Sequence, residues 1–346
     1  MSNQPAALRL LLAGFGNIGR RLAEIFLERA AYPGLADLDV VVVGITTGRH
    51  GALANRAGVD VGEALRAVKA DRDFAGLPDR ADLDTAAAVA TLEYDVLVET
   101  TPLSVAGRGE PAISWLRAAL ERDRHVITCN KGPIAWAYRE LAGLAAARGR
   151  ALLFETTVMD GAPIFALARH GLCGNTVRRV EGILNSTTNL VLCLMEQGST
   201  LAEAVADAQR LGVAEADASL DLDGWDAAVK LACLANALMG VELRPEEIER
   251  EGIAAVTPKR LAAARSSGRR IKMIAEAWRE GERAVGRVVA RELPVGDPFA
   301  LVEGRGSILR LHTDILGKLV IAEEEPDLSS TAYGVIADLF EVANRA

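Results

Sequence analysis

The chain has 346 residues, with 39 lysines and arginines against 47 aspartates and glutamates and a formal net charge of −8 at pH 7. At roughly 150 residues per domain this length predicts two domains with separate cores. The acidic balance, with no basic tail and no clustered arginine and aromatic stretch, argues against nucleic acid and favours a small-molecule partner. Aromatic residues make up only 4%, which favours close packing of helices on sheets.

Neither the N-terminus nor the cysteines indicate export. The first residues contain no charged segment ahead of an apolar run, and the run at 10–13 is too short for a signal core or a membrane span. The cysteines have no C-x-x-C spacing, so we expect reduced thiols packed as small apolar residues; they are Cys129, Cys173, Cys193 and Cys233. We therefore expect a cytoplasmic protein that does not contact membranes.

In the first half of the chain, short apolar runs alternate with helical patterns. This alternation is typical of βαβ units and of a parallel sheet that is buried on both faces. The predicted strands cover residues 8–13, 39–45, 95–99, 126–128 and 151–154. The predicted helices cover residues 20–31, 63–68, 111–122 and 133–148, and the prolines at 111 and 133 fit a first helical turn.

The pattern changes from about Glu155. Predicted helices cover 163–168, 189–197, 201–211 and 224–239, with a strand at 177–184. Further strands are predicted at 269–277, 283–292, 307–314 and 318–322, separated by glycine-containing turns. These strands suggest a mixed sheet covered by one helical layer, and a final helix at 331–344 is long enough to dock on the first domain.

A glycine-rich loop lies between the first predicted strand and the first predicted helix. Its G-x-G-x-x-G pattern comprises Gly14, Phe15, Gly16, Asn17, Ile18 and Gly19. In this context the first glycine permits a tight turn, the second lets a pyrophosphate approach, and the third permits close packing of helix and strand. We therefore predict an α/β fold with an N-terminal doubly wound Rossmann domain that binds NAD or NADP, and a second α+β domain.

The second strand ends without the acidic residue that grips the adenosine ribose of NAD. Arg49 lies there instead, and it either pairs with the 2′-phosphate of NADP or is a solvated loop residue, so the choice of cofactor stays open. Thr100 and Thr101 follow the 95–99 strand, at the carboxyl edge where open α/β sheets bind ligands. We predict that both contact the cofactor.

Asp226 and Lys230 are four residues apart on a predicted helix and therefore share one of its faces. Taken alone, this spacing favours a surface ion pair. However, Lys131 follows a sheet strand at the ligand-binding edge, where a second cation can meet the same substrate. Neighbouring ammonium groups and burial lower a lysine pKa, and a lysine so adjusted can accept an alcohol proton as hydride leaves.

Four segments together resemble the homoserine dehydrogenase family, and the resemblance extends over nearly the whole chain. They are residues 128–131, 155–161, 185–189 and 221–230, the last with the pattern D-x-x-G-x-D-x-x-x-K. The resemblance implies hydride transfer between L-aspartate 4-semialdehyde and L-homoserine, in the aspartate pathway that leads to threonine and methionine. It also implies that Lys131, also near the cofactor, and Lys230 serve proton transfer, with Asp226 beside the reacting hydroxyl.

The resemblance further assigns the substrate and cation ligands. Glu215 and Asp221 resemble the ligands of the substrate ammonium, which needs a carboxylate partner in a closed site. The segment with Asn185, Thr187 and Thr188 resembles the cleft lining that receives the substrate carboxylate, although capping of the next helix explains Thr188 equally well. A sodium or potassium loop is implied, with oxygen donors from four residues: Glu155, Val158, Asp160 and Ala162.

The family implies that residues 1–154, joined by 326–346, bind the dinucleotide, whereas residues 155–325 bind substrate and form a homodimer. Two departures stand out: Asp217-Ala218 replaces a D-P element, and acids at 323–327 replace a glycine-rich loop near the cofactor, where they would repel phosphate. The chain ends at Ala346, and we expect neither a regulatory extension, a fused kinase nor threonine feedback through such a domain.

Two other functions fit the same pattern less well. One is a dehydrogenase of this fold acting on another amino-acid semialdehyde or on aspartate. The other is a non-catalytic dinucleotide-binding sensor, since fold alone does not fix function.

Overall fold

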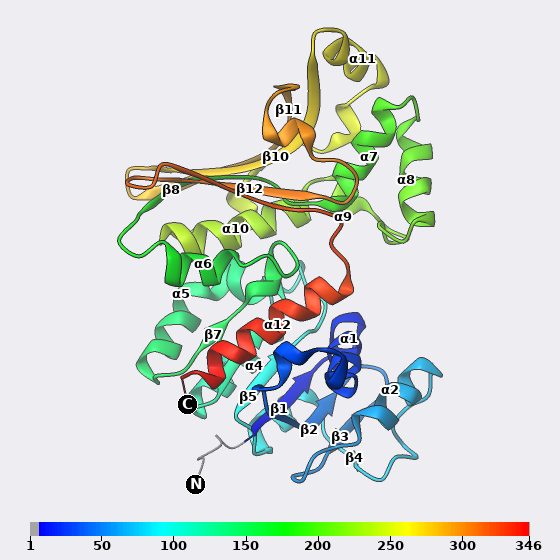
Figure 1. The fold of residues 1–346 in the computed structure, drawn as a ribbon, viewed down its shortest axis with the longest axis vertical. Helices are drawn as coiled ribbons and strands as arrows, with labels where there is room; N and C mark the ends of the chain where they lie inside the picture. The colour runs from blue at the N-terminus through cyan, green and yellow to red at the C-terminus, as the bar shows by residue number, and fades with distance from the viewer. Residues whose placement is uncertain (1–6, 346) are drawn as a thin grey trace. The chain divides into compact units, whose positions relative to one another are not determined.

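The computed structural model describes residues 7–345, and the other residues of the predicted first domain and closing helix lie outside this range. The chain divides into two compact units (Figure 1). The first holds the described residues up to Pro133, Ala137–Pro163 and the chain from Asp327 onward. The second holds Ile134–Trp136 and Ile164–Pro326.

The first unit is built on a seven-stranded sheet in the order β4-β3-β2-β1-β5-β6-β7. Its strands are β1 (Leu8–Ala13), β2 (Val40–Thr46), β3 (Ala52–Ala54), β4 (Arg80–Ala81), β5 (Val96–Glu99), β6 (His125–Thr128) and β7 (Leu152–Leu153). The neighbours β2, β1, β5, β6 and β7 pair in parallel, and the order reverses at β1, which is the doubly wound arrangement. The predicted α/β fold is thereby confirmed, and β3 and β4 add an antiparallel edge that the sequence pattern did not predict.

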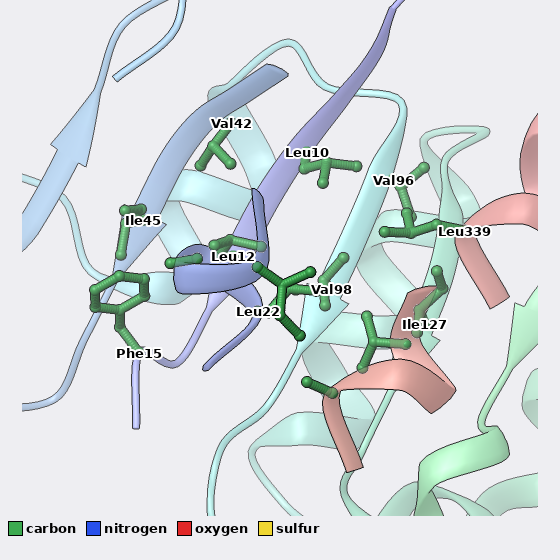
Figure 2. Packing of buried hydrophobic residues seen from close by; sticks show 14 of the residues in the cluster. Leu10, Leu12, Phe15, Leu22, Val42, Ile45, Val96, Val98, Ile127 and Leu339 are labelled. Carbon is green, nitrogen blue, oxygen red and sulfur yellow. The ribbon is translucent and has the colours of Figure 1, made fainter. Parts of the chain in front are cut away.

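Alternate residues of β1 supply two separate cores, one on each face of this sheet. Leu10 and Leu12 pack with Leu22 and Leu339, as Figure 2 shows, and all four are buried. Leu11 points to the opposite face and belongs to a second buried cluster. The continuous apolar run of β1 follows from this two-sided burial, since successive side chains point to opposite faces.

Six helices belong mainly to the first unit: α1 (Asn17–Leu27), α2 (Val61–Lys69), α3 (Thr85–Thr91), α4 (Ala112–Glu121), α5 (Lys131–Ala147) and α12 (Leu328–Ala343). The last of these packs against α1. The predicted starts of α5 and α12 were wrong because polar side chains cap both helices earlier in the chain. Asn130 accepts a hydrogen bond from the Gly132 amide, so α5 begins before Pro133. Asp327 caps α12 in the same way.

The second unit contains a six-stranded sheet in the order β13-β12-β8-β10-β11-β9. Its strands are β8 (Val177–Ile183), β9 (Glu249–Arg250), β10 (Arg269–Glu280), β11 (Arg283–Pro294), β12 (Ser307–Thr313) and β13 (Lys318–Glu323). All neighbours pair antiparallel except β9 and β11, so the predicted mixed sheet is confirmed. β10 extends beyond its predicted end because its pairing with β11 continues to Glu280 and Arg283.

The helices of this unit pack on the sheet directly or on one another. They are α6 (Ile164–Gly171), α7 (Ser186–Glu196), α8 (Leu201–Arg210), α9 (Ser219–Leu222), α10 (Trp225–Met239) and α11 (Pro258–Ser266). Helix α10 lies along the sheet and contacts β8, β10 and β11 (Figure 1). Helix α11 was not predicted, although Thr257 caps it and Pro258 occupies its first turn.

Candidate active site

The glycine loop joins β1 to α1 and has the geometry that each glycine was expected to provide. Gly14 has φ of +98°, and a Cβ there would lie 2.9 Å from the carbonyl carbon of Thr100, so a larger residue would be strained. A Cβ on Gly19 would lie 3.0 Å from the carbonyl oxygen of Gly14. Gly16 precedes α1, and no atom lies within 4 Å of the position that a Cβ would take there, which leaves room for a phosphate at the helix N-terminus.

The other residues of this loop have different surroundings. Phe15 is buried in the core, and Ile18 is partly buried against the same cluster. Asn17 is exposed, and its Oδ1 accepts a hydrogen bond of 2.5 Å from Arg20. The Phe15 and Ile18 side chains therefore pack inward, which leaves their backbone to face a ligand.

Arg49 lies in the exposed loop after β2. Its guanidinium is 2.6 Å from a carboxylate oxygen of Asp71, and the two side chains are 74% and 66% exposed. At the end of the strand itself, the hydroxyls of Thr46 and Thr85 lie 2.9 Å apart. The basic residue at this strand end is therefore accessible, but it already has an acidic partner.

The loops after β5 and β6 meet the glycine loop at the carboxyl edge of the sheet. The Thr100 hydroxyl donates to the Gly14 carbonyl at 3.1 Å, so Thr100 lies against the glycine turn. Thr101 follows it, half-buried. Lys131 is the first residue of α5, directly after the β6 loop, and is also half-buried. The structure thus brings the predicted cofactor contacts of the first unit to one edge.

Glu99 ends β5 and was not among the predicted site residues. Its side chain is fully buried and accepts hydrogen bonds from the Thr101 amide at 2.8 Å and the Thr128 hydroxyl at 2.6 Å. Burial raises the pKa of this carboxyl, and the bonds from Thr101 and Thr128 oppose that rise. The available sequence signal was an acid that closes an otherwise apolar strand.

In the second unit, Asn185 joins two carboxylates that are far from it in sequence. Its Nδ2 donates to Asp221 Oδ1 at 2.7 Å and to Asp226 Oδ2 at 2.9 Å. Burial, and then the charge of Asp226, raise the pKa of Asp221, whereas the bond from Asn185 lowers it. Both amide hydrogens of Asn185 are thereby used within the protein.

Lys230 completes this group from one turn further along α10. Its Nζ is 3.3 Å from Asp226 Oδ2 and donates to the Leu184 carbonyl at 2.7 Å. The Lys230 and Asp226 side chains are only 18% and 16% exposed, so this is not the solvated surface pair that the spacing alone allows. Asn185, Asp221, Asp226 and Lys230 form one cluster, hereafter the acid–lysine cluster.

The remaining predicted substrate residues lie around this cluster. Thr188 is buried, and its amide and hydroxyl both donate to Asn185 Oδ1, at 2.8 and 3.0 Å. The Thr187 hydroxyl donates to the Val213 carbonyl at 3.2 Å. Glu215 is exposed in the loop between α8 and α9, and no hydrogen bond within residues 7–345 places its carboxylate in the cluster. Thr187 and Thr188 thus support the site from within, whereas Glu215 lies in solvent.

The predicted cation loop packs against α12 in the first unit. Glu155 is 1% exposed, and its amide donates to Asp338 Oδ2 at 3.0 Å. Asp160 has φ of +43°, and its carboxylate accepts from Thr331 at 2.7 Å. Val158 and Ala162 are buried. No group of three or more His, Cys, Asp or Glu side chains in the described part of the chain is placed to hold a metal, so backbone carbonyls would have to supply most ligands.

The acidic segment before α12 includes a residue with a structural role. Asp327 accepts hydrogen bonds from the Ser329 and Ser330 amides, at 2.8 and 2.9 Å. It therefore caps the last helix, which explains an acid where the resemblance led us to expect glycine.

Among the described residues, no helix is long and apolar enough to cross a membrane.

Comparisons with known proteins agree on one family. Residues 14–155 match the model of the homoserine dehydrogenase NAD-binding domain, and residues 163–340 match the homoserine dehydrogenase model. The NAD(+)-dependent homoserine dehydrogenase of Pseudomonas canavaninivorans is 33% identical over 98% of this chain and 97% of its own. The homoserine dehydrogenase of Methanocaldococcus jannaschii is 30% identical over 97% of this chain and 98% of its own.

A solved structure shows the same architecture. A hyperthermophilic archaeal homoserine dehydrogenase in complex with NADPH is 29% identical, covers 98% of both chains and has a TM-score of 0.82. The family resemblance drawn from the sequence motifs is thereby confirmed.

Proposed function

Because the chain belongs to the homoserine dehydrogenase family, we propose that its own side chains carry the proton transfer that accompanies hydride exchange between L-aspartate 4-semialdehyde and L-homoserine. The acid–lysine cluster carries this proposal, because it holds a lysine, two carboxylates and a bridging amide in one partly buried group. The two alternative functions, a dehydrogenase for another substrate and an inert sensor, are not favoured.

The first unit binds the dinucleotide. When bound, the nicotinamide supplies or accepts the hydride. Gly14, Gly16 and Gly19 give the pyrophosphate a close backbone cradle at the start of α1, and Thr100 and Thr101 line the same edge. One relative is named NAD(+)-dependent and another was solved with NADPH, so both dinucleotides are candidates. We assign Arg49 to the 2′-phosphate of NADP, in competition with Asp71.

Proton transfer belongs to Lys131 of the first unit and Lys230 of the second. Asp226 and the Leu184 carbonyl fix the position of the Lys230 amine. In its neutral form this amine can take the hydroxyl proton of homoserine as hydride leaves, and Asp226 then stabilises the resulting ammonium. The ammonium returns the proton during aldehyde reduction. Lys131, at the start of α5 and close to the cofactor loops, is the second candidate for this proton transfer.

The substrate ammonium binds Asp221, with Glu215 as a second carboxylate from its exposed loop. A buried cation requires such a partner. Asn185 supports both acids instead of binding the substrate through its amide nitrogen, because its Nδ2 already donates to Asp221 and Asp226. The start of α7, with Thr187 and Thr188, receives the substrate carboxylate near the helix N-terminus.

The loop of Glu155, Val158, Asp160 and Ala162 binds sodium or potassium. A buried carboxylate together with backbone carbonyls is a hard oxygen donor set, which fits such cations. Because the loop packs on α12, a bound cation would stabilise that contact.

The second sheet supports the homodimer. Glu181 and Glu276 are neighbours on β8 and β10, and both pair with Arg179 and Arg291, so acidic and basic groups alternate on one face of the sheet. This face carries both acidic and basic groups, and a two-fold interface sets the same patch of each copy against the other. Val320, which lies in one row across the strands with Arg310 and Glu181, is 42% exposed.

We further propose that the protein is a cytoplasmic enzyme of the aspartate pathway.

The decisive experiment follows NADPH and NADH oxidation with aspartate semialdehyde for the wild type, Lys131→Ala, Lys230→Ala and the control Lys259→Ala. Lys259 is exposed on α11, and its loss should leave activity unchanged. Each catalytic variant should remain folded and lose roughly two or more orders of magnitude in kcat. Wild-type enzyme without turnover on either cofactor would refute the proposed function.

A further inference from the structure

Glu99 links the two cofactor-side loops of the first unit through a single buried carboxylate. One oxygen, Oε1, accepts from the amide and the hydroxyl of Thr101 in the loop after β5. The other, Oε2, accepts from the hydroxyl of Thr128 at the end of β6. One side chain therefore adds a second link between two strand ends that the backbone already pairs.

The hydrogen bonds continue from Thr128 to the helix that begins with Lys131. The Thr128 hydroxyl accepts from the Asn130 amide at 3.0 Å. Asn130 Oδ1 accepts from the Gly132 amide at 2.9 Å and so caps α5. Lys131 lies between Asn130 and Gly132, whose amides make these two hydrogen bonds. Its backbone is therefore held by the series of hydrogen bonds that starts at Glu99.

On its other side the network reaches the glycine loop. Thr100 stands between Glu99 and Thr101 in the chain, and its hydroxyl donates to the Gly14 carbonyl. Fixing Thr101 on Glu99 thus also fixes the residue that lies against the glycine turn. The carboxylate connects the dinucleotide loop with the proposed catalytic lysine.

Packing alone does not account for an acid at this place. Val96, Leu97 and Val98, the other residues of β5, are all fully buried and apolar. A buried carboxyl is unfavourable unless hydrogen bonds satisfy it, and Glu99 has donors from two different loops. Burial raises its pKa, and Thr128, whose hydroxyl can both donate and accept, matches either protonation state.

We propose that Glu99 is a positioning residue of the dehydrogenase, which sets Thr100 and Thr101 against the cofactor and Lys131 toward the reacting oxygen. The proposal rests on the proposed function for the role of Lys131. It does not require Glu99 to touch substrate or cofactor.

The test compares Glu99→Asp, which keeps the charge but shortens the side chain, with Glu99→Gln, which keeps the length. Aspartate cannot reach both loops, so the Kd for NADPH and NADH should rise and kcat should fall, each by roughly tenfold, as for loss of a buried hydrogen bond. Glutamine can accept from Thr101 and donate to the Thr128 hydroxyl, which can turn toward the Asn130 carbonyl 3.4 Å away. It should stay within about threefold of wild type.

Tyr94→Phe is the matched control in the same unit. The Tyr94 hydroxyl is buried and donates to the Val89 carbonyl at 3.1 Å, away from both loops. This variant should lower Tm but leave Kd and kcat unchanged. Glu99→Asp behaving in the same way would overturn the proposal, because Glu99 would then only support the fold. Glu99→Gln as impaired as Glu99→Asp would also overturn it, because a side chain of full length would then fail and reach would not be sufficient.

Thr128→Val and Thr128→Ser test the same link from its other end should Glu99→Asp not fold. Valine removes the hydroxyl and should raise Kd and lower kcat, whereas serine should restore both. Wild-type Kd and kcat in Thr128→Val would contradict the proposal. The Kd measurements need no turnover, so they test Glu99 even where absent activity of the wild type on aspartate semialdehyde has refuted the proposed function.

Discussion

The glycine loop of the first unit depends on its backbone, whereas the acid–lysine cluster of the second unit depends on its side chains. The loop is a backbone device, in which Gly14, Gly16 and Gly19 matter through the absence of a side chain. The cluster is a side-chain device, in which Asn185 holds two acids and one of those acids holds Lys230. The first should respond to added volume and be indifferent to pH, whereas the second should respond to charge.

The largest effect is expected at Gly14. Gly14→Ala places a methyl group 2.9 Å from the Thr100 backbone at φ of +98°, and such strain costs about 1–3 kcal/mol. Stability should fall by that amount, and NADPH should bind about a hundredfold more weakly because the turn must open. Urea unfolding and NADPH fluorescence titration measure the two effects.

Gly16→Ala tests the effect of an added side chain on NADPH binding without the backbone strain expected at Gly14. No atom lies within 4 Å of its added Cβ, and the backbone there is extended, with φ of −79°. Tm should stay at the wild-type value while the Kd for NADPH rises. A wild-type Kd in Gly16→Ala would mean that the phosphates do not approach this residue, and the loop would lose its assigned role.

In the cluster, Asn185→Ala should have the next largest effect. It removes both bonds to Asp221 and Asp226, and hydrogen bonds to charged groups contribute about 1.5–3 kcal/mol each. We expect kcat/KM for homoserine to fall roughly 10- to 100-fold, with the Kd for NADPH unchanged. Ser186→Ala, which loses only a bond to the Arg305 carbonyl at the same helix end, is the control and should remain active.

The sequence predicted the loop more completely than the cluster, for a physical reason. Consecutive residues between a strand and a helix define the loop, and β1 was predicted with its observed bounds of Leu8–Ala13. The cluster depends on how residue 185 meets residues 221 and 226. Spacing along one helix predicted that Asp226 and Lys230 share a face, but it gave no information on the Asn185 bridge.

The same distinction explains what the sequence pattern missed. Helix α3, Thr85–Thr91, is alanine-rich and lacks a clear apolar period, although Asp84 caps it. Glu99 looked like the polar end of a strand, because its donors at Thr101 and Thr128 become neighbours only when β5 pairs with β6. Contacts between strand ends follow from tertiary pairing, which local periodicity does not encode.

Asp221→Asn tests the dependence of the cluster on charge. Burial raises the pKa of Asp221 in the folded state, so its protonation stabilises the fold fully below the unfolded pKa, and this contribution is lost as pH rises through the folded pKa. The stability of wild type relative to Asp221→Asn should therefore decline across that window in urea unfolding at a series of pH values. A difference that is independent of pH would show that Asp221 titrates as it does in the unfolded chain.

The KM for homoserine should also depend on pH through Asp221, but low pH should weaken substrate binding where it stabilises the fold. Ionised Asp221 binds the substrate ammonium, so the wild-type KM for homoserine should rise as pH falls through the raised pKa. In Asp221→Asn, KM should be about tenfold higher at neutral pH, the loss expected for a charge-assisted hydrogen bond, and should vary less with pH. The control Asp217→Asn, an exposed acid of the preceding loop, should keep the wild-type profile.

The smallest effect is expected at Arg49, where the first unit does rely on a side-chain charge. Its partner Asp71 competes with a 2′-phosphate, and both side chains are more than half exposed, so the ion pair contributes only about 0–1 kcal/mol. Arg49→Ala should raise the KM for NADPH up to about fivefold and leave that for NADH unchanged, whereas Asp71→Ala should lower the KM for NADPH by a similar factor. Equal effects on the KM values of the two cofactors would mean that neither residue interacts with the 2′-phosphate. Cofactor choice would then depend on backbone geometry alone, as we expect for pyrophosphate binding by the glycine loop.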